Sequence, residues 1–147
     1  MTSAAGTPAG SDGTIRRRNP RLQGEIGLGA AIAWFAAEGY GVAIPLCDNR
    51  PYDLVVEHPT TGALLRVQVK TATSRKAATG HYHVGLRTTG GKQSFHTTKD
   101  FDNAASDLLF VLTDAREIYV IPRPEISNRN AIVLGDKWQG YRQGLLH

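Results

Sequence analysis

The chain has little of what disulfide-rich or membrane proteins need. It contains one cysteine, Cys47, which excludes an internal disulfide and is typical of proteins kept in a reducing cytoplasm. No apolar run approaches the roughly 18 residues that indicate a membrane-spanning helix. The N-terminus also lacks the apolar core of a signal peptide. We therefore expect a cytoplasmic protein that has no membrane partner.

The excess of positive charge is small. The 17 Lys and Arg residues against 13 Asp and Glu residues give a formal net charge of +4. This balance is compatible with a nucleic-acid partner but is weak evidence by itself. With 147 residues, of which 41% are hydrophobic, the chain is long enough for one substantial core and too short for two.

The N-terminal segment is rich in Ser, Thr, Gly, Pro and Ala and leads into three consecutive arginines, Arg16, Arg17 and Arg18. It shows no hydrophobic periodicity, which predicts a disordered basic tail over residues 1–20 and a single folded domain over residues 21–147. The arginines are candidates for contacts with DNA phosphates. The alternative is a solvated basic arm without a fixed partner, and the sequence leaves both open.

The most informative stretch is residues 52–71, which is typical of a β-hairpin. Residues 52–56 are aromatic and β-branched, and residues 64–71 alternate between apolar and polar, with a turn that contains Pro and Gly between the two runs. One face of the second strand carries Gln68 and Lys70, where a sheet usually places apolar groups. These polar side chains require an explanation.

Asp53 on the first predicted strand can reach Gln68 and Lys70 if the register agrees, because residues i and i+2 share a face about 7 Å apart. The set suits metal-assisted hydrolysis of a phosphodiester. Asp53 and the Gln68 oxygen are hard ligands for Mg²⁺, and Lys70 can orient the nucleophile or neutralise charge on the phosphate. The rival interpretation is a solvated sheet face, and the permissive pattern D-x(14)-Q-x-K leaves both open.

The same run resembles the core of the PD-(D/E)XK nuclease superfamily. Asp53 stands at the position of the motif acid, and Gln68, Val69 and Lys70 stand at (D/E)-x-K. The resemblance is greatest to the Q-x-K branch near intron-encoded homing endonucleases and Holliday-junction resolvases. The chain departs from the pattern because Pro51 does not directly precede Asp53 and because an amide replaces the second acid, which removes one negative charge.

The resemblance implies an α/β fold with a restriction-endonuclease-like αβββ core, in which helices cover a mixed central β-sheet. It also implies a DNA endonuclease of the junction-resolvase, homing or phage type that requires Mg²⁺ (or Mn²⁺) and acts on duplex or branched DNA. A compact nuclease that cuts both strands generally works as a symmetric dimer, so we expect a homodimer or a higher homo-oligomer. The alternative is a catalytically inactive DNA-binding relative, in which Gln68 marks decay of the site.

A first helix is predicted over residues 22–37 and is apolar almost all round, so we expect it to be buried on more than one side. Glu25 lies in its first turn, where a carboxylate interacts favourably with the helix dipole. In the resembled family a glutamate on this helix leans toward the metal site. The resemblance therefore implies Glu25 as a further catalytic residue and metal ligand, beside Asp53, Gln68 and the backbone carbonyl of Val69.

The segment after Lys70 contains hydroxyl groups and two cations. Ser74, Arg75 and Lys76 would suit contacts with the DNA phosphates that flank the cleaved bond. A plain polar loop is the alternative, and the sequence does not decide between them.

The remaining elements are predicted from alternation and apolar runs. We expect strands over residues 40–45, 81–87, 107–112 and 117–122, and a short last helix around Trp138. The continuous apolar run within residues 107–112 indicates a central strand that is covered on both faces.

Overall fold

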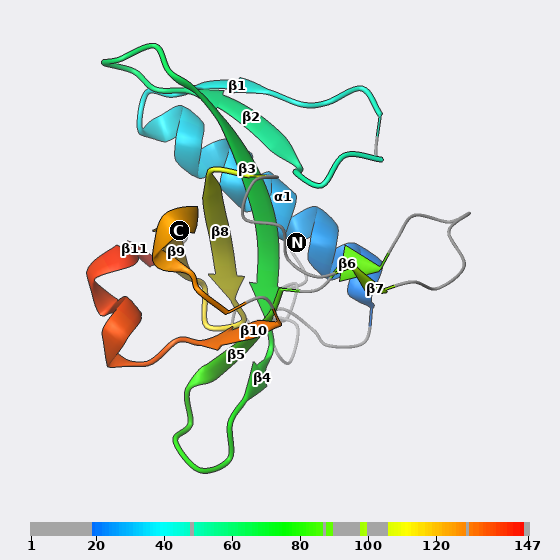
Figure 1. Ribbon diagram of the computed structural model, residues 1–147, viewed down its shortest axis with the longest axis vertical. Coiled ribbons are helices and arrows are strands. Elements are labelled where there is room, and N and C mark those ends of the chain that lie inside the picture. Colours follow the sequence, from blue (N-terminus) through cyan, green and yellow to red (C-terminus); the bar gives the residue numbers. More distant parts are fainter. Residues whose placement is uncertain are drawn as a thin grey trace, which may run out of the picture.

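Figure 1 shows the computed structural model of the chain. The structure describes residues 19–47, 49–86, 88–89, 98–99, 106–128 and 130–145. The arginines of the predicted tail, Arg16, Arg17 and Arg18, lie outside these ranges.

The helix α1 (Pro20–Ala37) opens the described part of the chain. Its N-cap is Asn19, whose side-chain oxygen accepts a hydrogen bond from the Leu22 N–H at 3.1 Å. Pro20 occupies the first helical turn, where an N–H has no intrahelical partner. The helix ends before Gly39, whose φ of 88° favours glycine. The observed helix therefore begins slightly before the predicted start and ends where predicted.

A six-stranded mixed sheet forms the centre of the molecule. Its strands, in spatial order, are β1 (Gly41–Ala43), β2 (Leu54–Glu57), β3 (Leu64–Ala72), β8 (Leu108–Thr113), β9 (Glu117–Pro122) and β11 (Arg142–Leu145). Strands β3 and β8 run parallel, and the other neighbouring pairs are antiparallel. This confirms the predicted α/β fold with a mixed central sheet, and the predicted hairpin is the β2–β3 pair.

Smaller elements surround this sheet. They are a three-stranded sheet of β4 (Ser74–Arg75), β5 (Tyr82–Gly85) and β10 (Ala131–Val133), a two-stranded sheet of β6 (Thr88–Thr89) and β7 (Thr98–Lys99), and the 3₁₀ helices η1 (Arg123–Glu125) and η2 (Asp136–Tyr141). Only Thr73 separates β3 from β4, so the chain passes from the central sheet into the small sheet almost without interruption (Figure 1).

Buried side chains form two clusters that lie on the two faces of the central sheet. One cluster lies between α1 and the sheet and includes Phe35, Val67 and Phe110. The other includes Val111 together with residues of β5, β10 and η2. Strand β8 contributes to both clusters, and residues 109–112 are fully buried. The predicted coverage of this strand on both faces is confirmed.

The helix α1 is buried along one stripe, so the expectation of burial on more than one side is wrong. The buried positions are Gln23, Gly27, Ala30, Ala31 and Phe35. On another side of the helix, Leu22 and Ile26 are 47% and 37% exposed. The far side is apolar largely because it contains alanine, which favours helix formation whether or not it is buried. Within the described ranges no helix, α1 included, is long and apolar enough to cross a membrane.

The helix α1 packs closely on β3 at Gly27. A Cβ atom added at this position would lie 2.7 Å from Thr71 Cγ2 and 3.4 Å from Val69 Cγ1. Glycine therefore allows the helix to pack directly on the strand that carries Gln68 and Lys70.

The predicted last helix is confirmed only as a short 3₁₀ helix, which ends at Tyr141. Trp138 lies in the 3₁₀ helix η2, and the chain then continues as β11, which pairs with β9 through Arg142 and Tyr119. Gly140 and Gly144 weaken helix formation in this segment, and Gly144 adopts a φ of 110° at an irregularity in the strand.

The glycines of α1 provide a matched test of the close contact. Gly29→Ala is expected to stabilise the protein by about 0.5–1 kcal/mol, since nothing lies within 4 Å of the added Cβ and alanine has the higher helix propensity. Gly27→Ala is expected to destabilise it by about 1 kcal/mol or more, because overpacking outweighs that gain. Urea denaturation of both variants measures the difference.

The double variant Gly27→Ala/Thr71→Ser tests whether the clash with Thr71 Cγ2 causes the loss of stability, because serine lacks this atom. It should recover most of the stability lost in Gly27→Ala. Equal stabilisation by Gly27→Ala and Gly29→Ala would show that α1 does not pack this closely on β3.

Candidate active site

Gln68 and Lys70 lie on one face of the central sheet, and Asp53 lies beside the same part of β3. Side chains alternate between the faces of a sheet, and Val67 belongs to the cluster under α1. Gln68 and Lys70 therefore project from the face that α1 does not cover. Asp53 directly precedes β2, whose Leu54 pairs with Val67, and its carboxylate lies close enough to Lys70 for the two charges to interact.

Where β2 begins, the carboxylate of Asp53 takes the place of a backbone acceptor. The Asp53 N–H still donates to the Val67 carbonyl at 2.8 Å. The next donor along this edge of β3, the Val69 N–H, donates to Asp53 Oδ2 at 2.7 Å. The N–H and C=O of one strand residue point toward the same neighbouring strand. The Val69 carbonyl therefore lies along the same edge of β3 as the Asp53 carboxylate.

Asp53 and Lys70 form a partly dehydrated pair of opposite charges. Desolvation raises the pKa of Asp53, and the Val69 N–H and the Lys70 ammonium oppose this shift. Burial lowers the pKa of Lys70, and the Asp53 carboxylate opposes that shift. Desolvation is the larger effect on both groups. Charges in such surroundings interact more strongly with a substrate than charges in water do.

Gln68 is 5% exposed, and its amide oxygen faces Arg123. Arg123 Nη1 donates to Gln68 Oε1 at 3.4 Å and to Ser106 Oγ at 2.7 Å. Arg123 and Ser106 are 1% and 2% exposed, so this contact lies on the closed side of Gln68. The Arg123 N–H also donates to the Asp107 carbonyl at 3.0 Å, which fixes the start of η1 against the start of β8.

Sequence reasoning missed Arg123. This residue stands between Pro122 and Pro124 at the end of a predicted strand, a context typical of an exposed loop. Its place beside Gln68 follows from the pairing of Leu108 with Pro122 and from the parallel pairing of β3 with β8. No local pattern in the sequence indicates either pairing.

The structure does not bring Glu25 to the other predicted site residues. The helix α1 covers the opposite face of the sheet, and the Glu25 side chain is 64% exposed, 3.6 Å from the Arg21 guanidinium. Because successive helical residues rotate by about 100°, Glu25 lies on the far side of the helix from the buried Gln23 and Gly27. Its role as a metal ligand therefore stays a hypothesis.

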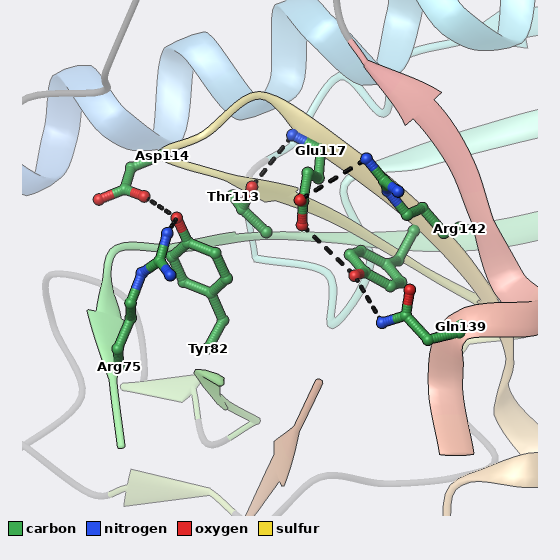
Figure 2. A network of polar contacts seen from close by, with 8 residues as sticks. Arg75, Tyr82, Thr113, Asp114, Glu117, Gln139 and Arg142 are labelled. Carbon is green, nitrogen blue, oxygen red and sulfur yellow. Dashed lines mark hydrogen bonds and ion pairs between the residues drawn. The ribbon is translucent and has the colours of Figure 1, made fainter. Parts of the chain in front are cut away.

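Ser74, Arg75 and Lys76 are exposed at the start of the hairpin formed by β4 and β5. The Arg75 guanidinium carbon lies 4.2 Å from the centre of the Tyr82 ring, and Nη2 donates to the Tyr82 hydroxyl at 2.6 Å. That hydroxyl donates to the Asp114 carboxylate in the turn between β8 and β9 (Figure 2). The Arg75 side chain is therefore exposed to solvent, and its contacts with Tyr82 also hold it in place.

Figure 2 also shows a second set of polar contacts, at the β9 end of the turn between β8 and β9. Thr113 Oγ1 accepts a hydrogen bond from the Glu117 N–H at 3.0 Å. The Glu117 carboxylate lies 3.6 Å from the Arg142 guanidinium, and Gln139 Nε2 donates to the Tyr119 hydroxyl at 3.2 Å. These contacts attach β11 and η2 to the central hairpin.

The oxygens beside Asp53 fit a hard divalent ion. In the part of the chain that the structure describes, no three His, Cys, Asp or Glu side chains converge on one point. However, Mg²⁺ retains several waters and is commonly held by one or two carboxylates together with substrate phosphates. The Asp53 carboxylate and the neighbouring Val69 carbonyl supply oxygen ligands of this kind.

A solved structure is similar to this chain. The solved structure of a bacterial homing endonuclease, I-Ssp6803I, matches the fold with a TM-score of 0.67 and 32% sequence identity, over 85% of this chain and 89% of that chain. The fold and the Asp53–Gln68–Lys70 group define the class as nucleases with a restriction-endonuclease-like fold.

A family model described as PD-(D/E)XK endonuclease matches residues 18–142. The chain belongs to the PD-(D/E)XK endonuclease family. A search of the curated proteins gives no significant match.

Lys70→Met is expected to stabilise the protein when no divalent metal is present, because it removes a partly dehydrated charge. Below the lowered folded-state pKa, Lys70 is protonated in both the folded and the unfolded state, so its full dehydration cost is present. As pH rises through the lowered folded-state pKa toward the ordinary value of 10.5, the folded state releases the proton first and the cost disappears. In EDTA the Tm should rise by ~2–4 °C at pH 7, and the difference should shrink by pH 10.

Lys76→Met is the matched control for this experiment, since Lys76 is exposed on the β4–β5 hairpin, and its Tm should stay near that of the parent. A lower Tm for Lys70→Met, or a difference independent of pH, would contradict the dehydrated state of Lys70.

Proposed function

We propose that the chain is a divalent-metal-dependent endodeoxyribonuclease that hydrolyses phosphodiester bonds and uses Mg²⁺ or Mn²⁺. The observation that carries this proposal is the Asp53 carboxylate, which accepts a hydrogen bond from the Val69 N–H at 2.7 Å and lies close enough to Lys70 for the two charges to interact. Membership of the PD-(D/E)XK family supports it, because the family implies a DNA substrate and its members generally use divalent metal ions.

We assign the metal-holding atoms to the Asp53 carboxylate and the Val69 carbonyl. A bound ion would polarise the phosphoryl group and acidify a water molecule. Of the other ligands expected from the sequence, Gln68 already accepts a hydrogen bond from Arg123, and Glu25 lies on the helix that covers the opposite face. Asp53 is then the main source of negative charge at the ion.

Lys70 supplies the positive charge of the site. Its ammonium donates a hydrogen bond to the attacking water or to a phosphate oxygen and neutralises the charge that develops there. Because burial lowers the pKa of Lys70, the ammonium also releases a proton more readily than an exposed lysine does. This property suits proton transfer to the leaving oxygen.

The solved relative favours duplex DNA over a four-way junction as the substrate, since it is described as a homing endonuclease and is 32% identical to this chain. One chain provides one pair of Asp53 and Lys70, so cleavage of both strands requires two chains. We therefore propose a homodimer or higher homo-oligomer. It would act in the cytoplasm, with the domain over residues 21–147 carrying the chemistry and the basic tail, residues 1–20, binding phosphates.

A catalytically inactive DNA-binding protein is the second candidate function. The neutral side chain of Gln68 favours it, because the usual carboxylate at this position is missing. Asp53 and Lys70 argue against an inactive protein, since both positions still carry the charged residues of the motif. The fold brings the two charges together as a pair whose dehydration is unfavourable for stability.

Cleavage assays on supercoiled, linear and four-way-junction DNA, with Mg²⁺ or with EDTA, test the proposal directly. Asp53→Asn and Lys70→Met should each lower the cleavage rate by about 100-fold or more, because each removes a charge that acts in the transition state. Glu57→Gln is the matched control, since Glu57 is exposed at the other end of β2 and should leave the rate unchanged.

Parental cleavage rates in both Asp53→Asn and Lys70→Met, or cleavage that persists in EDTA, would contradict the proposed mechanism. Glu25→Gln belongs in the same series. Loss of cleavage without loss of stability would place Glu25 in the site despite its exposed ion pair with Arg21, whereas an unchanged rate would remove it.

DNA binding by the β4–β5 hairpin is tested by the salt dependence of the Kd in EDTA. Each phosphate contact that is lost should reduce the slope of log Kd against log salt concentration by about one. We expect this change for Lys76→Ala and for Arg75→Ala, and no change for Arg21→Ala on the opposite face. Deletion of residues 1–18 should reduce the slope further, and an unchanged slope would show that the tail does not contact DNA.

A further inference from the structure

We propose that Arg123 is a positioning residue that fixes the orientation of the Gln68 amide, so that Gln68 presents its NH₂ group to a phosphate oxygen of the substrate. The inference rests on the proposed nuclease function. It assigns a role to a buried arginine that the motif does not include, and it changes the role of Gln68 from metal ligand to hydrogen-bond donor.

The orientation follows from the chemistry of the two side chains. A guanidinium group carries only donors, whereas a carboxamide has an acceptor at one end and donors at the other. The Arg123 Nη1 atom lies 3.4 Å from Gln68 Oε1 and donates to it. The reverse orientation would place the NH₂ group of Gln68 against a cation and would lose this hydrogen bond. The charge of Arg123 therefore selects one of the two amide orientations.

Burial determines which end of Gln68 can meet a substrate. Arg123 and Ser106 are 1% and 2% exposed, so the side that holds the Gln68 oxygen is closed. The Arg123–Ser106 hydrogen bond of 2.7 Å keeps the guanidinium in this place. Because the oxygen and the nitrogen of an amide point in different directions from their shared carbon, the NH₂ group is directed away from the Arg123 guanidinium. Gln68 and Lys70 share one face of β3, so a substrate that contacts Lys70 can also meet this group.

The identity of the proposed acceptor follows from charge. A phosphodiester carries negative oxygens, and an amide NH₂ donates to them without the repulsion that a carboxylate at the same place would cause. Fixed donors in a partly dehydrated site act strongly on developing negative charge. In this arrangement the neutral Gln68 does not mark decay of the site, because the amide has a function that a carboxylate cannot take over.

The contact itself is tested by stability, without metal or DNA. Urea denaturation is measured for the parent, Gln68→Glu, Arg123→Met and the double variant. With Arg123 present, Gln68→Glu should leave the midpoint unchanged or raise it, since the carboxylate pairs with the guanidinium. With Met at position 123, the same substitution should lower the midpoint, since the carboxylate is then buried without that partner. Additive effects would show that the two side chains do not interact.

The role in catalysis is tested by cleavage as a function of Mg²⁺ concentration. Gln68→Glu should lower kcat by about 100-fold, the effect typical of losing one transition-state donor, with the Mg²⁺ midpoint unchanged. Arg123→Met should lower kcat by about 10-fold or more, also without a change in the Mg²⁺ midpoint. Arg123→Lys should retain more activity than Arg123→Met because it keeps the charge and donors, and it also serves if Arg123→Met does not fold.

Two results would overturn the assignment. If Gln68→Glu cleaves at the parental rate with a lower Mg²⁺ midpoint, the position 68 oxygen is a metal ligand. If Arg123→Met and Arg123→Lys both cleave like the parent, Arg123 has no positioning role. A parent protein that cuts no DNA contradicts the nuclease function instead, and the stability coupling between Gln68 and Arg123 would still be measurable in that case.

Discussion

The hydrogen bond from the Val69 N–H to the Asp53 carboxylate is the interaction on which the site depends. It exists because β2 begins at Leu54, which leaves this edge of β3 without a backbone partner from β2 at the position of Val69. The carboxylate therefore accepts the hydrogen bond that a further residue of β2 would otherwise accept, and this bond sets its direction. A longer β2 would satisfy the same N–H with a backbone carbonyl and would leave Asp53 without a fixed direction.

The two faces of β3 determine which side chains surround this interaction. One set of alternating residues, with Val67 among them, is held under α1 by a buried cluster, and that packing commits Gln68 and Lys70 to the other face. A shift of one residue would exchange the two sets and bury the charged one, so hydrophobic packing specifies the register of the site. The parallel pairing with β8 and the glycine contact of α1 hold the strand from its edge and from its covered face.

The sequence was sufficient for the parts of the fold that local chemistry determines. Alternation and turn residues predicted the β2–β3 hairpin, and the placing of Gln68 and Lys70 on one face followed from the period of a strand. The sequence was insufficient to predict contacts between segments that are far apart in the chain. Arg123 reaches Gln68 through strand pairings that no local pattern encodes, and the apolar composition of α1 did not reveal that Leu22 and Ile26 face solvent. The aromatic spacing predicted a helix around Trp138 but not its end at Tyr141, after which the chain pairs with β9 as β11.

The near-continuity of β3 and β4 has a mechanical consequence. Lys70 and the exposed Arg75 belong to one extended stretch of backbone, interrupted only at Thr73, and the far end is tied by the Tyr82–Asp114 contact to the turn between β8 and β9. Such a stretch transmits a displacement along its length instead of absorbing it in a loop. A displacement of the β4–β5 hairpin would therefore also shift Lys70, so the position of the exposed cations and the position of Lys70 are coupled through the backbone.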